Sequence, residues 1–198
     1  TALERYKDDA NVMQISGYMY DVPEFAARKA ALFLPLTTSW GWGTWKRAWQ
    51  QFDLQAAGWQ ILQTDHGLRR RFNLDEAYDY AGMLERQMEG HIDSWAIRWY
   101  WSVFRSGGSV LFPPVTMVRN TGLDGSGTHG RGWLNRIYGS ASLEPAELPE
   151  MPDDVIVRSD DVSALRRAIW RQSGGWVRRV IDSARRARSV LGRTVSKV

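Results

Sequence analysis

The sequence contains no cysteine and only three histidines among its 198 residues. Disulfides and thiolate metal sites are therefore excluded, and any metal would need oxygen or imidazole ligands. There is also no run of about 18 apolar residues, the length that a transmembrane helix requires. The first residues lack the basic flank and apolar stretch of a signal peptide. From these absences we expect a soluble, cytoplasmic protein.

Charge is unevenly distributed, although the net formal charge is only +4. The segment after Asp161 carries ten arginine and lysine residues and a single acid, Asp182, so the preceding 161 residues together are acidic. In the 176–193 segment, apolar residues fall on one helical face with arginines beside them, which is typical of a helix lying on an anionic membrane surface. The alternative is a helix docked on the body of the protein. Nucleic acid is not an expected partner, because the aromatic residues lie apart from this basic segment.

Tryptophan is abundant: eight of the eleven lie between Trp40 and Trp101. In the first group, Trp42, Trp45, Trp49 and Phe52 are spaced as on one face of a helix. In the second, which starts at Ile92, the same spacing holds for Trp95, Ala96, Trp99, Tyr100, Val103 and Phe104. The pattern predicts two helices with heavy aromatic faces.

The remaining patterns predict an α/β, helix-rich layout. Strands are expected at Val12 to Gly17, Ser109 to Phe112 and Val115 to Arg119, and helices at Glu24 to Ala31 and Asp75 to Glu89. Residues 120–130 contain four glycines, which is typical of a loop. We therefore divide the chain into a body (1–141), an acidic, proline-containing linker (142–160) and a basic amphipathic helical tail (161–198).

Four separated segments together resemble one family. They are Ile15-Ser-Gly-Tyr-Met, Ser39-Trp-Gly-Trp-Gly-Thr-Trp-Lys, Ile92-Asp-Ser-Trp-Ala-Ile-Arg-Trp-Tyr and Gly122-Leu-Asp-Gly-Ser-Gly-Thr-His. In this order they resemble the C-terminal, acceptor-side portion of bacterial family-two glycosyltransferases of the GT-A type, which use nucleotide-diphospho-sugars. The resemblance runs from about Ala2 to about Gly130 and implies the C-terminal part of a GT-A-like mixed sheet with packed helices.

The Asp-x-Asp motif, through which such enzymes hold Mg²⁺ or Mn²⁺ under the donor diphosphate, is absent from the sequence. We therefore expect the metal and the nucleotide-sugar donor to be used by the full enzyme, and neither to be held securely by this chain alone. By the same resemblance, His129 matches a histidine that completes the metal or diphosphate site. A surface loop carrying a solvated histidine is the alternative.

The catalytic base of an inverting transfer is a carboxylate on the acceptor side. Asp93 is our candidate, because it precedes the second tryptophan helix and matches an acid of the family; Glu89 is the second choice. The alternative for Asp93 is an N-cap of that helix, in which the carboxylate accepts backbone N–H bonds.

The candidate acceptor-binding residues are Trp40 and Trp42, whose indoles could stack on a sugar ring, and Ser16, Gly17 and Tyr18 at the end of a predicted strand. Arg69 to Arg71 could hold the diphosphate of a lipid-linked acceptor, although a solvated helix face is the more ordinary interpretation.

Two functions follow. The first is the acceptor-binding and catalytic-base portion of a glycosyltransferase that acts on a surface glycan or lipid-linked acceptor, peripheral on the inner face of the membrane. The second is a non-catalytic carbohydrate-binding or regulatory module derived from that fold.

Overall fold

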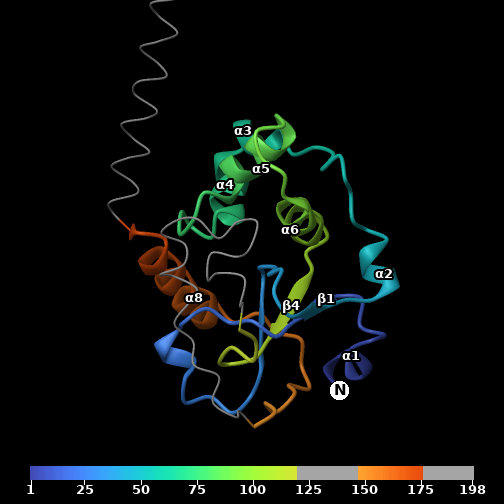
Figure 1. Cartoon of the computed structure of the whole chain (residues 1–198), viewed down its shortest axis with the longest axis vertical. Helices are drawn as coiled ribbons and strands as arrows, with labels where there is room; N and C mark the ends of the chain where they lie inside the picture. The colour runs from blue at the N-terminus through green and yellow to red at the C-terminus, as the bar shows by residue number, and fades with distance from the viewer. Residues whose placement is uncertain (120–146, 176–198) are drawn as a thin grey trace, which may run out of the picture.

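The computed structural model of the chain describes residues 1–119 and 147–175, which form a mixed sheet surrounded by helices (Figure 1). This confirms the α/β class. The described elements are α1 (Ala2–Arg5), β1 (Val12–Ser16), the 3-10 helix η1 (Pro23–Phe25), β2 (Leu32–Leu34), β3 (Trp42–Gly43), α2 (Lys46–Trp49), α3 (Ile61–Thr64), α4 (His66–Phe72), α5 (Tyr80–Met88), α6 (Trp95–Arg105), β4 (Ser109–Phe112) and α8 (Ser159–Gln172).

The sheet has the strand order β2-β4-β1-β3. The central strands β1 and β4 are parallel, and each has an antiparallel neighbour on its outer side. Because parallel strands need a long crossover connection, residues 17–108 and the helices within them separate β1 from β4. Both central strands are almost entirely buried, and they confirm the strands predicted from Val12 and from Ser109.

Alternate residues of the sheet face two different cores, as the twofold period of a strand dictates. Val12 and Leu111 belong to a small cluster that also contains Tyr6. Met13 and Val110 point to the opposite face, into the main cluster, to which α4, α5, α6 and α8 contribute. In Figure 1, α6 leads directly into β4. The main cluster is therefore the core on which the helices pack.

The second tryptophan helix is confirmed as α6. Of its predicted inner residues, Trp99, Tyr100 and Val103 are buried. The helix ends at Arg105. Gly107, just beyond its C-cap, has a positive φ of 64°, and the amide of Gly108 donates to the carbonyl of Val103 at 3.0 Å. A glycine readily adopts this left-handed conformation, which explains why the helix stops there.

The prediction of a first tryptophan helix that includes Trp42 is wrong. Trp42 and Gly43 form β3, paired with β1, and the helix covers only Lys46–Trp49. Gly41 has a positive φ of 52° and turns the chain into the strand. Pairing with β1 therefore determines the conformation of Trp42 in place of the helical spacing.

Three further predicted elements differ from the structure. Only Pro23–Phe25 is helical in the segment that was expected to be a helix up to Ala31, because Ala31 instead donates its amide to the carbonyl of Glu150 at 2.9 Å. Residues 115–119 form no strand, since they follow two prolines that lack ladder donors. The helix expected from Asp75 starts at Tyr80, because residues 74–76 all have positive φ.

Helix α8 packs on the body through one apolar face. Ala164, Leu165, Ala168 and Ile169 lie at helical spacing and are buried in the main cluster. Its first turn also contains the buried Asp161, whose carboxylate lies 3.0 Å from the guanidinium of Arg28. The boundary placed at residue 160 thus falls inside a helix. The 176–193 segment and the 120–130 loop lie outside the described residues.

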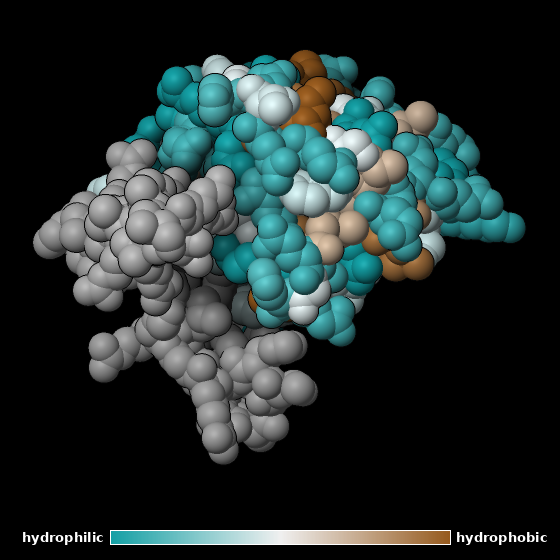
Figure 2. Space-filling model, turned by 90° about the horizontal axis from the view of Figure 1, so that it is seen from above, coloured by the Kyte–Doolittle hydropathy of each residue, from teal (hydrophilic) through white to brown (hydrophobic). Residues whose placement is uncertain are grey.

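No helix in the two described ranges has the length and apolar character needed to cross a membrane. Seen from above, the described surface is mostly hydrophilic, with small and separate hydrophobic areas (Figure 2).

Candidate functional site

A cavity of about 300 Å³ lies between the end of β1, the 36–40 segment, α5, α6 and the C-terminal end of α8. Its walls are largely aromatic, and no described residue that lines it is charged. Hydroxyl groups are supplied by the threonines and serine of the 36–40 segment and by Ser173. The aromatic lining residues are Tyr18, Tyr20, Trp40, Tyr78, Tyr80, Trp95, Trp99 and Tyr100.

Two candidate acceptor-binding residues form one wall of this cavity. The rings of Tyr18 and Trp40 meet edge to face, with centroids 4.9 Å apart. The remaining three candidates, Ser16, Gly17 and Trp42, do not line the cavity.

Ser16 is buried behind this wall and fixes its shape. Its hydroxyl bonds to the carbonyl oxygen of Tyr18 at 2.8 Å and to the Thr38 hydroxyl at 2.6 Å. The same oxygen accepts the amide of Tyr18 at 3.1 Å. Ser16 therefore joins two segments of the cavity wall and positions their residues.

Gly17 allows the 36–40 segment to lie against the end of β1. Its amide donates to the carbonyl of Gly41 at 2.6 Å. A Cβ atom added to Gly17 would lie 2.7 Å from that oxygen and 3.0 Å from a methyl carbon of Val118. A side chain at position 17 would thus push apart the two segments that carry Tyr18 and Trp40.

We expect Gly17→Ala to lower the free energy of unfolding by about 1–3 kcal/mol, the usual cost of overpacking. The near-UV circular dichroism of the aromatic residues should change as well, because the Trp40 segment must move. Chemical unfolding with both signals checks this.

Gly90→Ala is the matched control, because Gly90 has a positive φ of 76° but nothing within 4 Å of an added Cβ. The Gly90→Ala variant should be somewhat less stable, because alanine is strained at a positive φ, while its near-UV spectrum stays unchanged. An unaltered spectrum and stability for Gly17→Ala would contradict the packing argument.

Gln14 connects two walls of the cavity from beneath. Its side chain is fully buried. The amide oxygen accepts a hydrogen bond from the indole N–H of Trp99 at 2.7 Å, and the amide nitrogen donates to the Thr38 carbonyl at 2.8 Å. One residue of β1 therefore holds α6 and the 36–40 segment in fixed positions.

Tyr100 lies deep in the site and remains uncharged. Its hydroxyl donates to the carbonyl of Phe72 at 3.0 Å, and its ring stacks on the Phe72 ring with centroids 4.5 Å apart. Complete burial raises the pKa of the hydroxyl far above its ordinary value. Tyr100 therefore supplies an apolar face to the cavity and no acid–base group.

Asp93 is exposed and lies two residues before Trp95, which lines the cavity. The N-cap of α6 is Ser94, so the alternative interpretation of Asp93 as the N-cap is wrong. The amide of Ser94 instead donates to the side-chain oxygen of Gln87. Asp93 is thus near the cavity without forming part of its wall.

Within the two described ranges, no group of three or more histidines and acids could hold a metal ion. His91 pairs with Glu89 at 3.2 Å on the surface. His129 lies outside the described residues. The use of Mg²⁺ or Mn²⁺ by the full enzyme stays a prediction.

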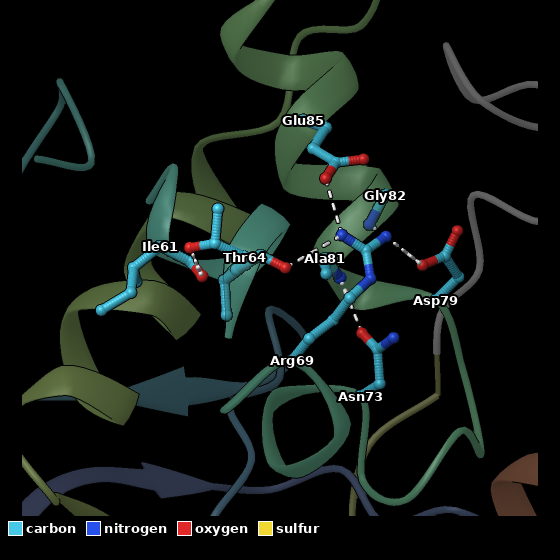
Figure 3. Close-up of polar contacts among 9 residues, drawn as sticks. Ile61, Thr64, Arg69, Asn73, Asp79, Ala81, Gly82 and Glu85 are labelled. Carbon is cyan, nitrogen blue, oxygen red and sulfur yellow. Dashed lines mark hydrogen bonds and ion pairs between the residues drawn. The ribbon is translucent and has the colours of Figure 1, made fainter. Parts of the chain in front are cut away.

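Arg69 joins α4 to α5 (Figure 3). Its guanidinium lies 2.6 Å from the carboxylate of Glu85 and 3.5 Å from that of Asp79. Burial alone would lower the pKa of Arg69, but the hydrogen bond and charge of Glu85, with the charge of Asp79, raise it. Arg70 is also paired, at 3.0 Å from Asp75. Of the three arginines considered for a diphosphate, Arg69 therefore joins two helices and Arg70 pairs with the turn that follows α4.

The sequence patterns missed several cavity residues. Tyr78 and Ser173 line the cavity but were given no role. Ile169 also lines it and comes from the segment taken as a separate tail. The helical spacing of apolar residues in α8 was the available signal, since a helix with one apolar face must bury it against something.

No family model, curated protein or solved structure matches the chain. The likeness to family-two glycosyltransferases therefore depends only on the four sequence segments.

Proposed function

We propose that the chain is the acceptor-side half of a GT-A-type glycosyltransferase and that its aromatic cavity receives a sugar of the acceptor glycan. The observation that carries this proposal is the meeting of Tyr18, Trp40 and Trp95 around one cavity. These residues come from three of the segments on which the family resemblance is based. Aromatic faces stack on the C–H faces of sugars, and nearby hydroxyls can bond to sugar hydroxyls.

In this proposal, Asp93 takes the proton from the attacking acceptor hydroxyl as the nucleotide-sugar bond breaks on the opposite face of the donor sugar. The exposed position of Asp93 beside Trp95 leaves it accessible to a ligand that extends from the cavity. The donor and a divalent cation would be held mainly by residues other than those described, with His129 contributing near the diphosphate. A membrane-facing role of the 176–193 segment would suit a lipid-linked acceptor.

A carbohydrate-binding module without turnover is the second candidate. It is favoured by one specific observation, the lack of any charged side chain among the described residues of the cavity wall. Transfer or hydrolysis of a nucleotide-sugar by the chain in the presence of Mn²⁺ would contradict this second candidate. Glycan binding without either reaction would support it.

We expect Trp40→Ala to weaken glycan binding at least tenfold, which corresponds to about 1.4 kcal/mol. The loss follows from removing one aromatic wall. A glycan array identifies a ligand, and titration followed by tryptophan fluorescence measures its affinity for each variant.

Trp170→Ala is the matched control, because Trp170 is a partly exposed tryptophan of α8 that does not line the cavity. The Trp170→Ala variant should bind the glycan with the same affinity as the unsubstituted protein. If the unsubstituted chain bound no glycan, or if both variants lost affinity equally, the proposal would fail.

A further inference from the structure

Three tryptophans and a phenylalanine form a cluster at the surface beside the cavity. Trp42 comes from β3, Trp49 from the end of α2, Phe52 from the turn after it and Trp95 from the start of α6. The ring centroid of Trp42 is 5.4 Å from that of Trp95 and 5.7 Å from that of Trp49. The rings of Trp49 and Phe52 are 4.6 Å apart. We call these four residues the surface tryptophan cluster.

The cluster leaves aromatic surface in contact with water. Trp49 is 39% exposed and Trp95 is 38% exposed, whereas Trp99 directly behind them is buried. Exposure of large apolar side chains forgoes the free energy that burial would give, about 25 cal/mol per Å². Trp99 already fills the core at this position, so burial in the core does not account for the exposed parts of Trp49 and Trp95.

The hydrogen bonds separate the structural tryptophans from those of the cluster. The indole N–H of Trp45 donates to the Leu3 carbonyl at 2.9 Å, and Arg47 covers its ring at 4.4 Å. The indole N–H groups of Trp99 and Trp101 also donate to protein oxygens. Within residues 1–119 and 147–175, those of Trp42, Trp49 and Trp95 have no protein acceptor. The cluster therefore presents aromatic surface and indole N–H donors to a ligand.

Trp95 makes the cluster continuous with the cavity. It lines the cavity and is also in contact with Trp42, to which its ring is inclined by 31°. A ligand that leaves the cavity past Trp95 therefore meets the rings of Trp42 and Trp49 next.

The size and the rim of the cluster favour a small polar ligand with apolar faces. A stable protein–protein interface buries about 800 Å² on each partner, far more than a few partly exposed rings can provide. Three residues in or just after α2 are polar and exposed: Lys46, Gln50 and Gln51. Sugar rings fit these conditions, since they combine C–H faces with hydroxyls.

We propose that the surface tryptophan cluster binds further sugar units of the glycan whose first unit occupies the cavity, so that the ligand is an oligosaccharide. This inference rests on the proposed function, and it adds that Trp42 and Trp49 determine how long a chain the site prefers.

The test compares Trp49→Ala with the unsubstituted protein on glycans of one to six units. The probes are glucose and N-acetylglucosamine oligomers, together with any glycan found on the array and its enzymatically shortened forms. We expect the unsubstituted protein to bind longer chains more tightly. For Trp49→Ala the affinity should fall about tenfold for the longest chain and less than twofold for the single sugar. The more conservative Trp49→Phe should restore part of the difference.

Equal losses for all chain lengths, or no dependence on length in the unsubstituted protein, would overturn the inference. If Trp40 mattered for binding and Trp49 did not, only this inference would fail. If no glycan bound at all, the proposed function would fail with it. Sedimentation provides a further check, because a dimer that is lost in Trp49→Ala would identify a second copy of the chain as the occupant and overturn the inference. Trp170→Ala again serves as the matched control.

Discussion

Replacing Leu165 with alanine should lower the free energy of unfolding by about 2–5 kcal/mol, the range for a leucine deleted from a packed core. Leu165 is fully buried in the main cluster, although it lies in the segment that the charge distribution assigned to a tail. The loss should therefore appear in the unfolding of the whole body. Urea unfolding followed by far-UV circular dichroism measures it.

Leu148→Ala is the control for this experiment, because Leu148 is 81% exposed. Its effect should stay within about 0.5 kcal/mol, as for most surface substitutions. Leu165→Ala should also weaken glycan binding, since α8 contributes Ile169 to the cavity wall. If Leu165→Ala left the unfolding midpoint unchanged, α8 would be an independent tail and this account of the core would be wrong.

Gln14→Leu should destabilise the protein by about 2–6 kcal/mol, because it leaves two buried groups without partners at about 1–3 kcal/mol each. These groups are the indole N–H of Trp99 and the Thr38 carbonyl. Glycan affinity should fall in the same variant, since both groups belong to residues of the cavity wall. Urea unfolding and fluorescence titration measure the two effects.

A double-mutant cycle with Trp99→Phe isolates the hydrogen bond. Because Trp99→Phe removes the donor, the two substitutions together should cost less than the sum of their separate effects, by about 0.5–3 kcal/mol. Gln63→Leu, at an exposed position of α3, is the control for the change of amide to alkyl group. Additive effects of Gln14→Leu and Trp99→Phe would show that the bond does not couple the strand to the helix.

Local patterns predicted the two central strands and the second tryptophan helix. The strands at Val12 and Ser109 and the helix from Trp95 follow the expected periods, because packing on the sheet agrees with their local preferences. Trp42 shows where this reasoning fails. Its spacing from Trp45 and Trp49 was helical, but glycines at 41 and 43 and a free edge of β1 favoured a strand. Spacing alone does not reveal such an edge.

The candidate site could be predicted only where it lies close to a strand end. Tyr18 lies two residues after the end of β1. Because ligands in such sheets gather at the carboxyl ends of strands, its place in the cavity wall was foreseeable. Tyr78 and Ser173 reach the same cavity from distant parts of the chain. Their positions depend on how α5 and α8 pack, which no short motif encodes.

The parallel pairing of β1 and β4 has a consequence for the order of assembly during synthesis. Residues 17–108 form the loop that this pairing closes, and closing a long loop costs entropy before its contacts form. Non-local pairing of this kind slows folding. Tyr18 and Tyr100 stand near the two ends of that loop, and Ser173 follows it. A nascent chain therefore has no complete cavity until α8 has left the ribosome, so the site is among the last parts of the described body to form.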